Sequence, residues 1–243
     1  MNKKIIFPAV LISGLYLLFL AGCSKDEDTI APVISLAGGN NVIYSLPSTA
    51  GGAGTWIDPG FSANDDKDGA LTSVSVSGAA SVNLNRKGTY TVTYSVSDKA
   101  GNSSTETRTI NVVNDAEAFA GTYAHSIDTC TATPSGAVNP SPVVTTSDSV
   151  NNLVSIDNFG GFNNSGTGFR TKIEVTFAGA SVGSAITGAV GAAQGLGGSA
   201  YLSQIYPAPA SSVVSGAPST AFVIKYQWTD GGTNDVCITT YNR

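Results

Sequence analysis

The feature that most constrains this chain is a strict alternation of apolar and polar side chains in residues 89–98, TYTVTYSVSD. Its aromatic and aliphatic side chains share one face of an extended chain: Tyr90, Val92, Tyr94 and Val96. A period of two is the pattern of a β-strand with one buried face. Because such a face needs a second sheet to cover it, the segment predicts a layered β-structure.

The neighbouring residues extend this pattern over residues 30–114. Residues 99–102, KAGN, predict a turn, and Ile110 and Val112 resume the alternation in a returning strand. Four further short strands are expected at residues 33–36, 42–46, 71–76 and 82–84. This spacing is typical of a β-sandwich.

A second region of alternating segments predicts another β-domain over residues 118–243. Its recognisable pieces are NLVSIDNFGGF, TKIEVTF, FVIKYQW and VCITTYNR. Residues 229–235, TDGGTND, are expected to form the last hairpin turn, and residues 114–117 the linker between the domains. The chain is therefore predicted to be all-β, with a β-sandwich followed by an antiparallel β-barrel or sandwich.

The N-terminal residues indicate export. Lys3 and Lys4 precede an apolar run from Ile5 to Gly22, which is typical of a signal peptide, although its length would also suit a retained membrane anchor. The run ends in LAGC, which resembles the bacterial lipobox and implies a diacylglycerol on Cys23. Residues 1–22 are then the lipoprotein signal peptide, and residues 23–29 a lipidated tether that holds the chain to the membrane.

The charged residues 24–28, SKDED, resemble the export tag of Bacteroidetes-type lipoproteins. This resemblance implies a lipid anchor in the outer membrane with the chain exposed at the cell surface.

Cysteine usage agrees with export. The chain has three cysteines, and removal of Cys23 leaves Cys130 and Cys237 as a pair in an oxidising compartment. A disulfide between them would tie the first and last strands of the second domain together and contribute about 4 to 5 kcal/mol. The alternative is two buried free thiols.

Charge argues against nucleic acid as a partner. Without Lys3 and Lys4, the twelve basic residues fall to ten against seventeen acidic ones, a net charge of −7. Phosphate contacts need a basic face. Asp65, Asp66 and Asp68 precede Gly69 and suggest a weak calcium site, but the rest of an EF-hand pattern is missing and a solvated acidic turn is the alternative. No cofactor is expected.

Two family resemblances follow from these segments. WIDPGFSANDDKDG together with RKGTYTVTYSVSDKAGN resembles the bacterial surface Ig-like domain, whose members mostly act as spacers. The order Gly-Thr-Tyr, Asn-Phe-Gly and a closing aromatic strand resembles the C-terminal domain of Bacteroidetes-type surface lipoproteins, which is described as lipocalin-like. That resemblance implies a lipocalin-like β-domain over residues 118–243.

Enzymatic activity is not expected. Residues 179–183 spell G-x-S-x-G, but His125 is the single histidine and precedes Ser181, whereas an α/β-hydrolase places its histidine last. No catalytic residue is therefore assigned. Two functions remain: a non-enzymatic binding module, with carbohydrate as the expected ligand, or an assembly component that contacts envelope proteins. For the first, Phe162, Tyr201 and Tyr206 are the expected ligand-binding residues.

Overall fold

The computed structural model of this 243-residue chain describes nine stretches of it, separated by short gaps. They are residues 27–123, 125–131, 137–157, 172–179, 184–188, 201–206, 211–215, 221–230 and 233–243. Within them the regular structure is β-strand, with two short 3₁₀ helices, so the all-β prediction is confirmed. No helix in these stretches is long and apolar enough to cross a membrane. The signal peptide of residues 1–22 and Cys23 lie outside the described residues.

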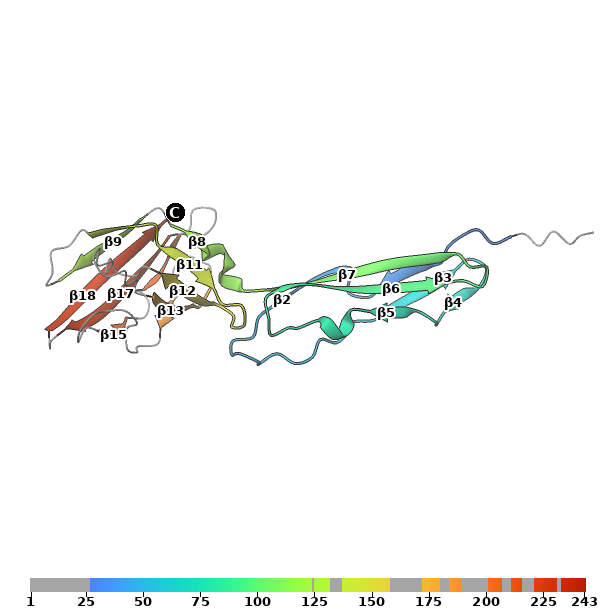
Figure 1. Ribbon diagram of the computed structural model, residues 1–243, viewed down its shortest axis with the longest axis horizontal. Helices are drawn as coiled ribbons and strands as arrows, with labels where there is room; N and C mark the ends of the chain where they lie inside the picture. The colour runs from blue at the N-terminus through green and yellow to red at the C-terminus, as the bar shows by residue number, and fades with distance from the viewer. Residues whose placement is uncertain are drawn as a thin grey trace, which may run out of the picture.

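Two sheets form the N-terminal sandwich, which extends from β1 to β7. One sheet has the order β1 (Val33–Leu36), β3 (Phe61–Asp65), β4 (Gly69–Leu71). The other has the order β2 (Asn41–Ser45), β7 (Ser103–Val113), β6 (Gly88–Ser97), β5 (Ser75–Ser77). All neighbours are antiparallel except β2 and β7. Alternation places Val92, Tyr94 and Val96 in the core between the sheets (Figure 1).

A buried arginine joins the two sheets of the N-terminal sandwich. Arg108 of β7 is fully buried and donates to Asp58 Oδ1 at 2.7 Å. It also donates to the carbonyl oxygens of Ala37 and Gly60, which flank β1 and β3 in the other sheet, at 2.7 and 3.0 Å. Tyr94 donates its hydroxyl proton to Asp58 Oδ2 at 2.8 Å, and burial together with this hydrogen bond raises the pKa of Tyr94 to about 12. Asp58 is therefore the polar centre of the sandwich.

Two predicted strands of this region differ from the structure. The strand expected at residues 71–76 is split, because Leu71 ends β4 and Ser75 begins β5. Residues 82–84 form no strand and follow the 3₁₀ helix η1 (Ala79–Ser81). The helix begins after Gly78, which has φ 85° and lies so close to Thr91 that a Cβ would clash with its carbonyl oxygen. A glycine turn thus directs the chain out of the sheet at this point.

The C-terminal β-unit extends from β8 to β18, and its described residues form two sheets. One sheet has the order β14 (Ile186–Gly188), β13 (Lys172–Phe177), β12 (Leu153–Asp157), β11 (Val143–Thr146), β8 (Gly121–Thr122). The other has the order β10 (Ala137–Pro140), β9 (His125–Cys130), β18 (Thr233–Asn242), β17 (Ala221–Asp230), β15 (Tyr201–Ile205), and β16 (Ser212–Ser215) also pairs with β17. The β17–β18 ladder continues to Asp230 and Thr233, so the turn predicted at residues 229–235 is shorter than expected.

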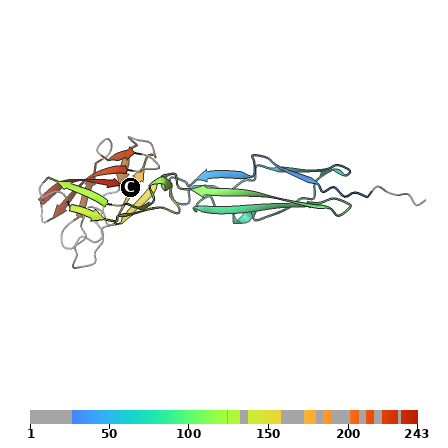
Figure 2. The same cartoon turned by 90° about the horizontal axis from the view of Figure 1, so that it is seen from above.

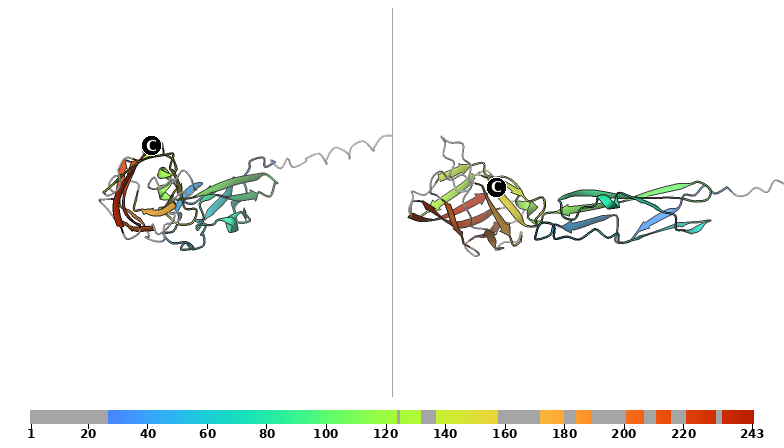
Figure 3. Two further views of the ribbon diagram at one scale, coloured as in Figure 1. Left: turned by 60° about the vertical axis from the view of Figure 1, so that its left-hand side comes forward. Right: turned by 60° about the horizontal axis from the view of Figure 1, so that its bottom comes forward.

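The two sheets of the C-terminal β-unit are connected along both edges. At one edge the connection is the chain itself, because β8 of the smaller sheet leads into β9 of the larger sheet, and β10 leads back into β11. At the other edge, Ile186 donates to the carbonyl of Ser211 and Val213 donates to that of Ser184, both at 3.1 Å. The two sheets therefore curve around a common core as a flattened barrel, and hydrogen bonds join them along one edge (Figure 3). This arrangement supports the barrel alternative of the sequence prediction.

Aromatic side chains fill the interior of the barrel at the end that faces the N-terminal sandwich. They are fully buried: Phe119, Tyr123, Phe177, Phe222 and Tyr241. The rings of Phe222 and Tyr241 stack with centroids 4.6 Å apart, and those of Phe119 and Phe177 lie 4.5 Å apart. These contacts form the packed core of this end of the barrel.

The two β-units lie end to end and meet at a short, ordered junction (Figures 1 and 2). The segment predicted to be a linker is largely the 3₁₀ helix η2 (Asp115–Phe119). Asn114 precedes it and is 1% exposed. Its Oδ1 atom accepts hydrogen bonds from the backbone nitrogens of Ala116 and Asn152, and its Nδ2 atom donates to the carbonyls of Ser147 and Val150, all between 2.9 and 3.0 Å.

Direct contacts between the two β-units reinforce the junction. The backbone N–H of Lys87 donates to the carbonyl of Asp148 at 2.7 Å, and that of Asn151 donates to the carbonyl of Pro47 at 2.8 Å. The Lys87 ammonium also lies 3.1 Å from Glu117 Oε2 in η2. Backbone hydrogen bonds fix both distance and orientation, so we conclude that the two units form one rod.

We predict that Asn114→Ala loosens this junction. The substitution leaves four buried or part-buried backbone groups without their partner, so the free energy of unfolding should fall by about 2 to 3 kcal/mol. Urea unfolding measures this loss, and small-angle X-ray scattering should show a wider range of molecular lengths. Asn111→Ala is the matched control, because Asn111 lies three residues earlier and its side chain bonds at the exposed surface. Equal stability of the Asn114 variant and the wild type would contradict the prediction.

Candidate functional site

The three expected ligand-binding residues differ in how much of each the structure describes. Phe162 lies outside the described residues. Tyr201 is the first residue of β15, where its backbone pairs with Thr229. Tyr206 follows the last residue of β15, and its side chain is half-buried. Of the three predicted residues, Tyr206 is therefore the one around which a site can be built.

Tyr206 lies on the outer face of the larger barrel sheet. Its backbone N–H donates to the carbonyl of Lys225 at 2.8 Å, which extends the β15–β17 ladder by one residue. Alternation along these strands buries Ile205 and Tyr226 in the core and turns their neighbours outward. The outward neighbours form what we call the Tyr206 surface: Gln204, Tyr206, Lys225, Gln227 and, across the ladder on β18, Ile238.

Side-chain contacts hold the Tyr206 ring in place. Its hydroxyl group donates to Gln227 Oε1 at 3.1 Å. The Lys225 ammonium lies 5.1 Å from the centre of the ring, within the range of a cation–π interaction. Beneath them, the Lys225 backbone N–H donates to Ser211 Oγ at 2.9 Å, which ties the strand to the chain before β16. The ring is thus preorganised on a rigid sheet.

The chemistry of the Tyr206 surface suits a polyhydroxylated ligand. An aromatic ring offers a flat apolar face for the C–H groups of a sugar ring, while the amides of Gln204 and Gln227 both donate and accept hydrogen bonds. Ile238 is 39% exposed and adds apolar area beside them. The described part of this surface brings together no nucleophile and base, so the arrangement can bind but has no evident route to chemistry.

A concave surface that no sequence pattern indicated lies in the N-terminal sandwich. A hollow of about 480 Å³ is lined by residues 53–55 and 80–85. Both polar atoms of the Asn85 side chain bond to the backbone of Ala53, at 2.8 and 3.0 Å. The lining has no aromatic ring, and the Asn85 amide is already used to hold the segment at Ala53. The hollow is therefore a weaker candidate for ligand binding than the Tyr206 surface.

The acidic residues predicted as a weak calcium site separate into three environments. Asp65 is buried at the end of β3, and Asp66 is exposed in the following turn. Asp68 is occupied by Lys99, whose backbone N–H and ammonium donate to its carboxylate at 2.7 and 2.9 Å. These two hydrogen bonds hold the pKa of Asp68 below its usual value. The carboxylate of Asp65 lies instead beside those of two aspartates from other parts of the chain.

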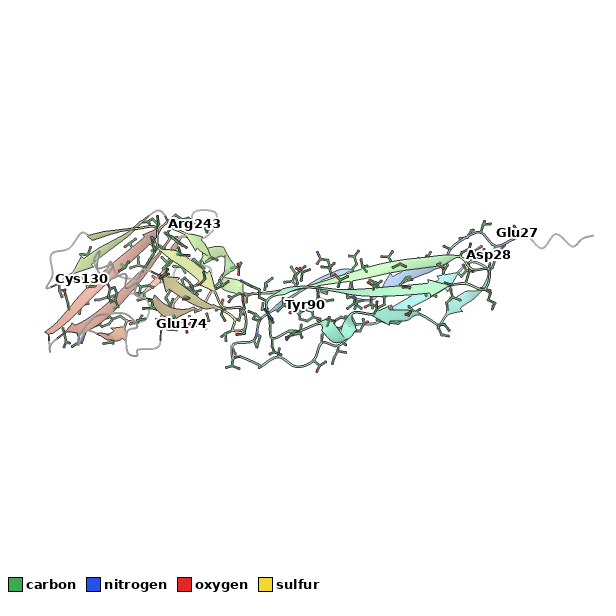
Figure 4. The ribbon with its side chains drawn as sticks, in the orientation of Figure 1. Glu27, Asp28, Tyr90, Cys130, Glu174 and Arg243 are labelled. Carbon is green, nitrogen blue, oxygen red and sulfur yellow. A yellow bond between two sulfur atoms is a disulfide. The ribbon has the colours of Figure 1, made fainter. Side chains whose placement is uncertain are left out.

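The structure joins Cys130 and Cys237 in a disulfide (Figure 4). The two residues face each other in the β9–β18 ladder, with their Cα atoms 4.1 Å apart. The first long strand of the barrel and its last strand are therefore side by side, as the cysteine spacing predicted. Both thiols are used by this bond and are not available for metal binding. Asp235 beside them accepts hydrogen bonds from the backbone and hydroxyl of Thr131, at 2.9 and 2.7 Å.

Comparison with known families identifies part of the chain. Residues 48–112 match the family described as bacterial surface protein, Ig-like domain. The Ig-like resemblance is therefore confirmed for these residues, which run from the loop before β3 nearly to the end of β7. The lipocalin-like resemblance of the C-terminal β-unit stays a prediction. No curated protein matches the chain.

Two solved structures are similar over most of the chain. The lipoprotein BT2262 from Bacteroides thetaiotaomicron is 18% identical, with 86% of this chain and 99% of that chain covered and a TM-score of 0.35. The CBM51-2 domain in complex with GlcNAc and the INT domains of Clostridium perfringens ZmpB are 18% identical, with 86% of this chain and 43% of that chain covered and a TM-score of 0.24. Both TM-scores are low, and these similarities assign no function to the chain.

We predict that loss of the disulfide destabilises the barrel and spares the sandwich. The double variant Cys130→Ala, Cys237→Ala removes a cross-link between residues 107 positions apart, so the unfolding free energy of the barrel should fall by about 4 kcal/mol. Guanidinium unfolding can follow this loss through near-UV circular dichroism. Thr129→Ala, at an exposed position next to Cys130, is the control. A loss below about 1 kcal/mol would show that the bond contributes little.

Proposed function

We propose that this chain is a non-enzymatic, surface-displayed protein that binds carbohydrate through the Tyr206 surface. The observation that carries the proposal is a half-buried tyrosine held between an amide and an ammonium group on the outside of a rigid sheet. A tyrosine that serves only the core has its ring buried, as Tyr226 does one position further along the paired strand. Tyr206 instead presents ring and polar groups together.

The shape of the molecule supports this proposal. The N-terminal sandwich and the barrel lie end to end, with Asp28 at the far end of the sandwich and β15 on the barrel (Figures 1 and 4). Because the junction is ordered, the sandwich acts as a spacer of fixed direction. A ligand-binding surface on the barrel would then be held away from whatever anchors the N-terminal end.

The proposed anchor is the lipid on Cys23, with the chain attached to the outer membrane and exposed at the cell surface. The supporting observations are the LAGC sequence and the charged residues 24–28 that follow it. Acyl chains would replace the membrane hold of the removed signal peptide. In this arrangement the N-terminal end of the rod lies next to the bilayer.

We predict that Cys23→Ser leaves an unprocessed precursor in a host with lipoprotein-processing enzymes. Serine has no thiol to accept diacylglycerol, so the signal peptide should stay attached and the protein should lose its lipid mass. Gel mobility and mass spectrometry of the membrane fraction measure both changes. Ser24→Ala is the matched control and should mature normally. A Cys23 variant that still matures to wild-type size would contradict the anchor.

A glycan array tests the binding proposal with the chain from Ser24 onward, residues 24–243, which lacks the cysteine proposed to carry the lipid. We expect at least one glycan class to bind, and Tyr206→Ala to weaken that binding about tenfold, because stacking and a hydrogen-bonding group are both lost. Tyr206→Phe keeps the ring and should retain most of the affinity. Tyr90→Ala removes a tyrosine from the N-terminal sandwich and should leave binding unchanged.

The outcome also separates the two functions that the sequence left open. Binding that is unaffected by Tyr206→Ala would move the site away from this surface. A blank array, combined with recovery of one stable protein partner from outer membranes, would replace the carbohydrate proposal by the assembly role. Melting temperatures of all variants must match that of the wild type for either conclusion.

A further inference from the structure

Three aspartates from distant parts of the sequence meet at the far end of the N-terminal sandwich. Asp28 lies before β1, Asp65 is the last residue of β3, and Asp98 follows the last residue of β6. One carboxylate oxygen from each lies within 4.8 Å of the others. Figure 4 shows Asp28 at this end of the rod, beside the connection between β3 and β4. The tertiary fold, and not local spacing, therefore creates the cluster.

Asp65 is the buried member with an unused oxygen. Its side chain is 2% exposed, and its Oδ1 atom accepts hydrogen bonds from the backbone nitrogens of Lys67 and Asp68. Its Oδ2 atom is buried and has no hydrogen-bond partner. A buried carboxylate oxygen without a partner costs free energy, so a native chain that keeps one requires an explanation. A cation bound between the three carboxylates supplies one.

The other two aspartates are held in position by their own hydrogen bonds. Asp98 is 8% exposed, and its Oδ1 atom accepts from the backbone nitrogens of Gly101 and Asn102 at 2.7 and 2.8 Å. The Asn102 amide bonds to both Asp98 Oδ2 and the carbonyl of Asp28, at 2.8 and 3.1 Å. Asn102 thus links the segment before β1 to the β6–β7 connection and keeps Asp28 next to Asp98.

The spacing of these oxygens fits calcium. Ca²⁺ binds carboxylate oxygens at about 2.4 Å, so two oxygens on one ion are at most about 4.8 Å apart. Three carboxylates and water can complete its flexible shell of six to eight oxygens, whereas Mg²⁺ needs a near-ideal octahedron and gives up its water reluctantly. The neighbouring Lys99 ammonium is directed to Asp68, 2.9 Å away, rather than placed at the centre of the three carboxylates.

We propose that Asp28, Asp65 and Asp98 bind one Ca²⁺ ion at the N-terminal end of the sandwich. The ion connects the segment before β1 to the ends of β3 and β6, so it stabilises the sandwich and fixes the point where the chain enters it. Asp28 follows Cys23 by five residues. Calcium would therefore also set the direction of the rod relative to the membrane, a consequence that rests on the proposed anchor, whereas the binding itself does not.

Thermal melting of the chain from Ser24 onward, residues 24–243, tests the site after treatment with EDTA. We expect 10 mM Ca²⁺ to raise the melting temperature of the N-terminal sandwich by about 5 °C or more, which is the stabilisation expected of a site that is half-saturated at about 0.1 to 1 mM Ca²⁺, here called the calcium midpoint. Equilibrium dialysis with radioactive calcium should give one ion per chain. The barrel lies at the other end of the rod, so we expect it to melt in a separate transition that calcium leaves unchanged, and this transition serves as an internal control.

Charge-removing variants identify the ligands. Asp65→Asn removes the charge but keeps an oxygen that accepts from the backbone N–H groups of Lys67 and Asp68. Asp28 lies before β1 and outside every described strand, so Asp28→Asn should leave the fold of the sandwich intact. Both should shift the calcium midpoint at least tenfold higher. Asp66→Asn, exposed in the same turn, should leave it unchanged. No shift in wild-type melting at 10 mM Ca²⁺, an unchanged midpoint in both variants, or an equal shift with Mg²⁺ would each overturn the proposal.

Discussion

The side chain of Asn114 is the interaction on which the overall geometry depends. It closes the end of β7, caps η2 and ties down the connection between β11 and β12, all from a buried position. A carboxamide can donate and accept in fixed directions at the same time, which makes it suited to a crossing of three chain segments. Because this crossing is ordered, the sandwich and the barrel behave as one rod, and a surface on the barrel has a defined direction relative to the N-terminus.

The two sheets of each β-unit are held together by different interactions in the two halves of the rod. The N-terminal sandwich has two open sheets, and the buried Arg108 joins them through its bonds to Asp58 and to the carbonyl of Ala37. Such a pair contributes little when it replaces apolar packing, but removal of either partner leaves a buried charge and is costly. The barrel instead uses a cluster of aromatic rings, hydrogen bonds between its two sheets along one edge and one disulfide. A spacer and a scaffold for a surface are thus stabilised by different means.

The sequence predicted much of the fold because period-two alternation reports burial directly. It located β6, β13 and β17 and the pairing of the two cysteines, since each depends on local pattern or on counting. It did not identify Arg108, although a signal was present: Arg108 shares the face of Ile110 and Val112, so an arginine stood where the alternation required an apolar residue. The role of Gly78 was also missed. Its turn leads into the 3₁₀ helix η1, and the strand expected at residues 82–84 does not form.

The sequence by itself determined the all-β class, the division into two regions of alternation and the tyrosine at position 206, because these follow from the residues and their spacing along the chain. Only the tertiary structure decided which polar groups meet. Local spacing grouped Asp65 with Asp66 and Asp68, whereas the fold brings it to Asp28 and Asp98. Gln227 reaches Tyr206 for the same reason, across a ladder whose strands are far apart in sequence. Contacts between distant residues depend on strand register, and register is set by the packing of the whole sheet.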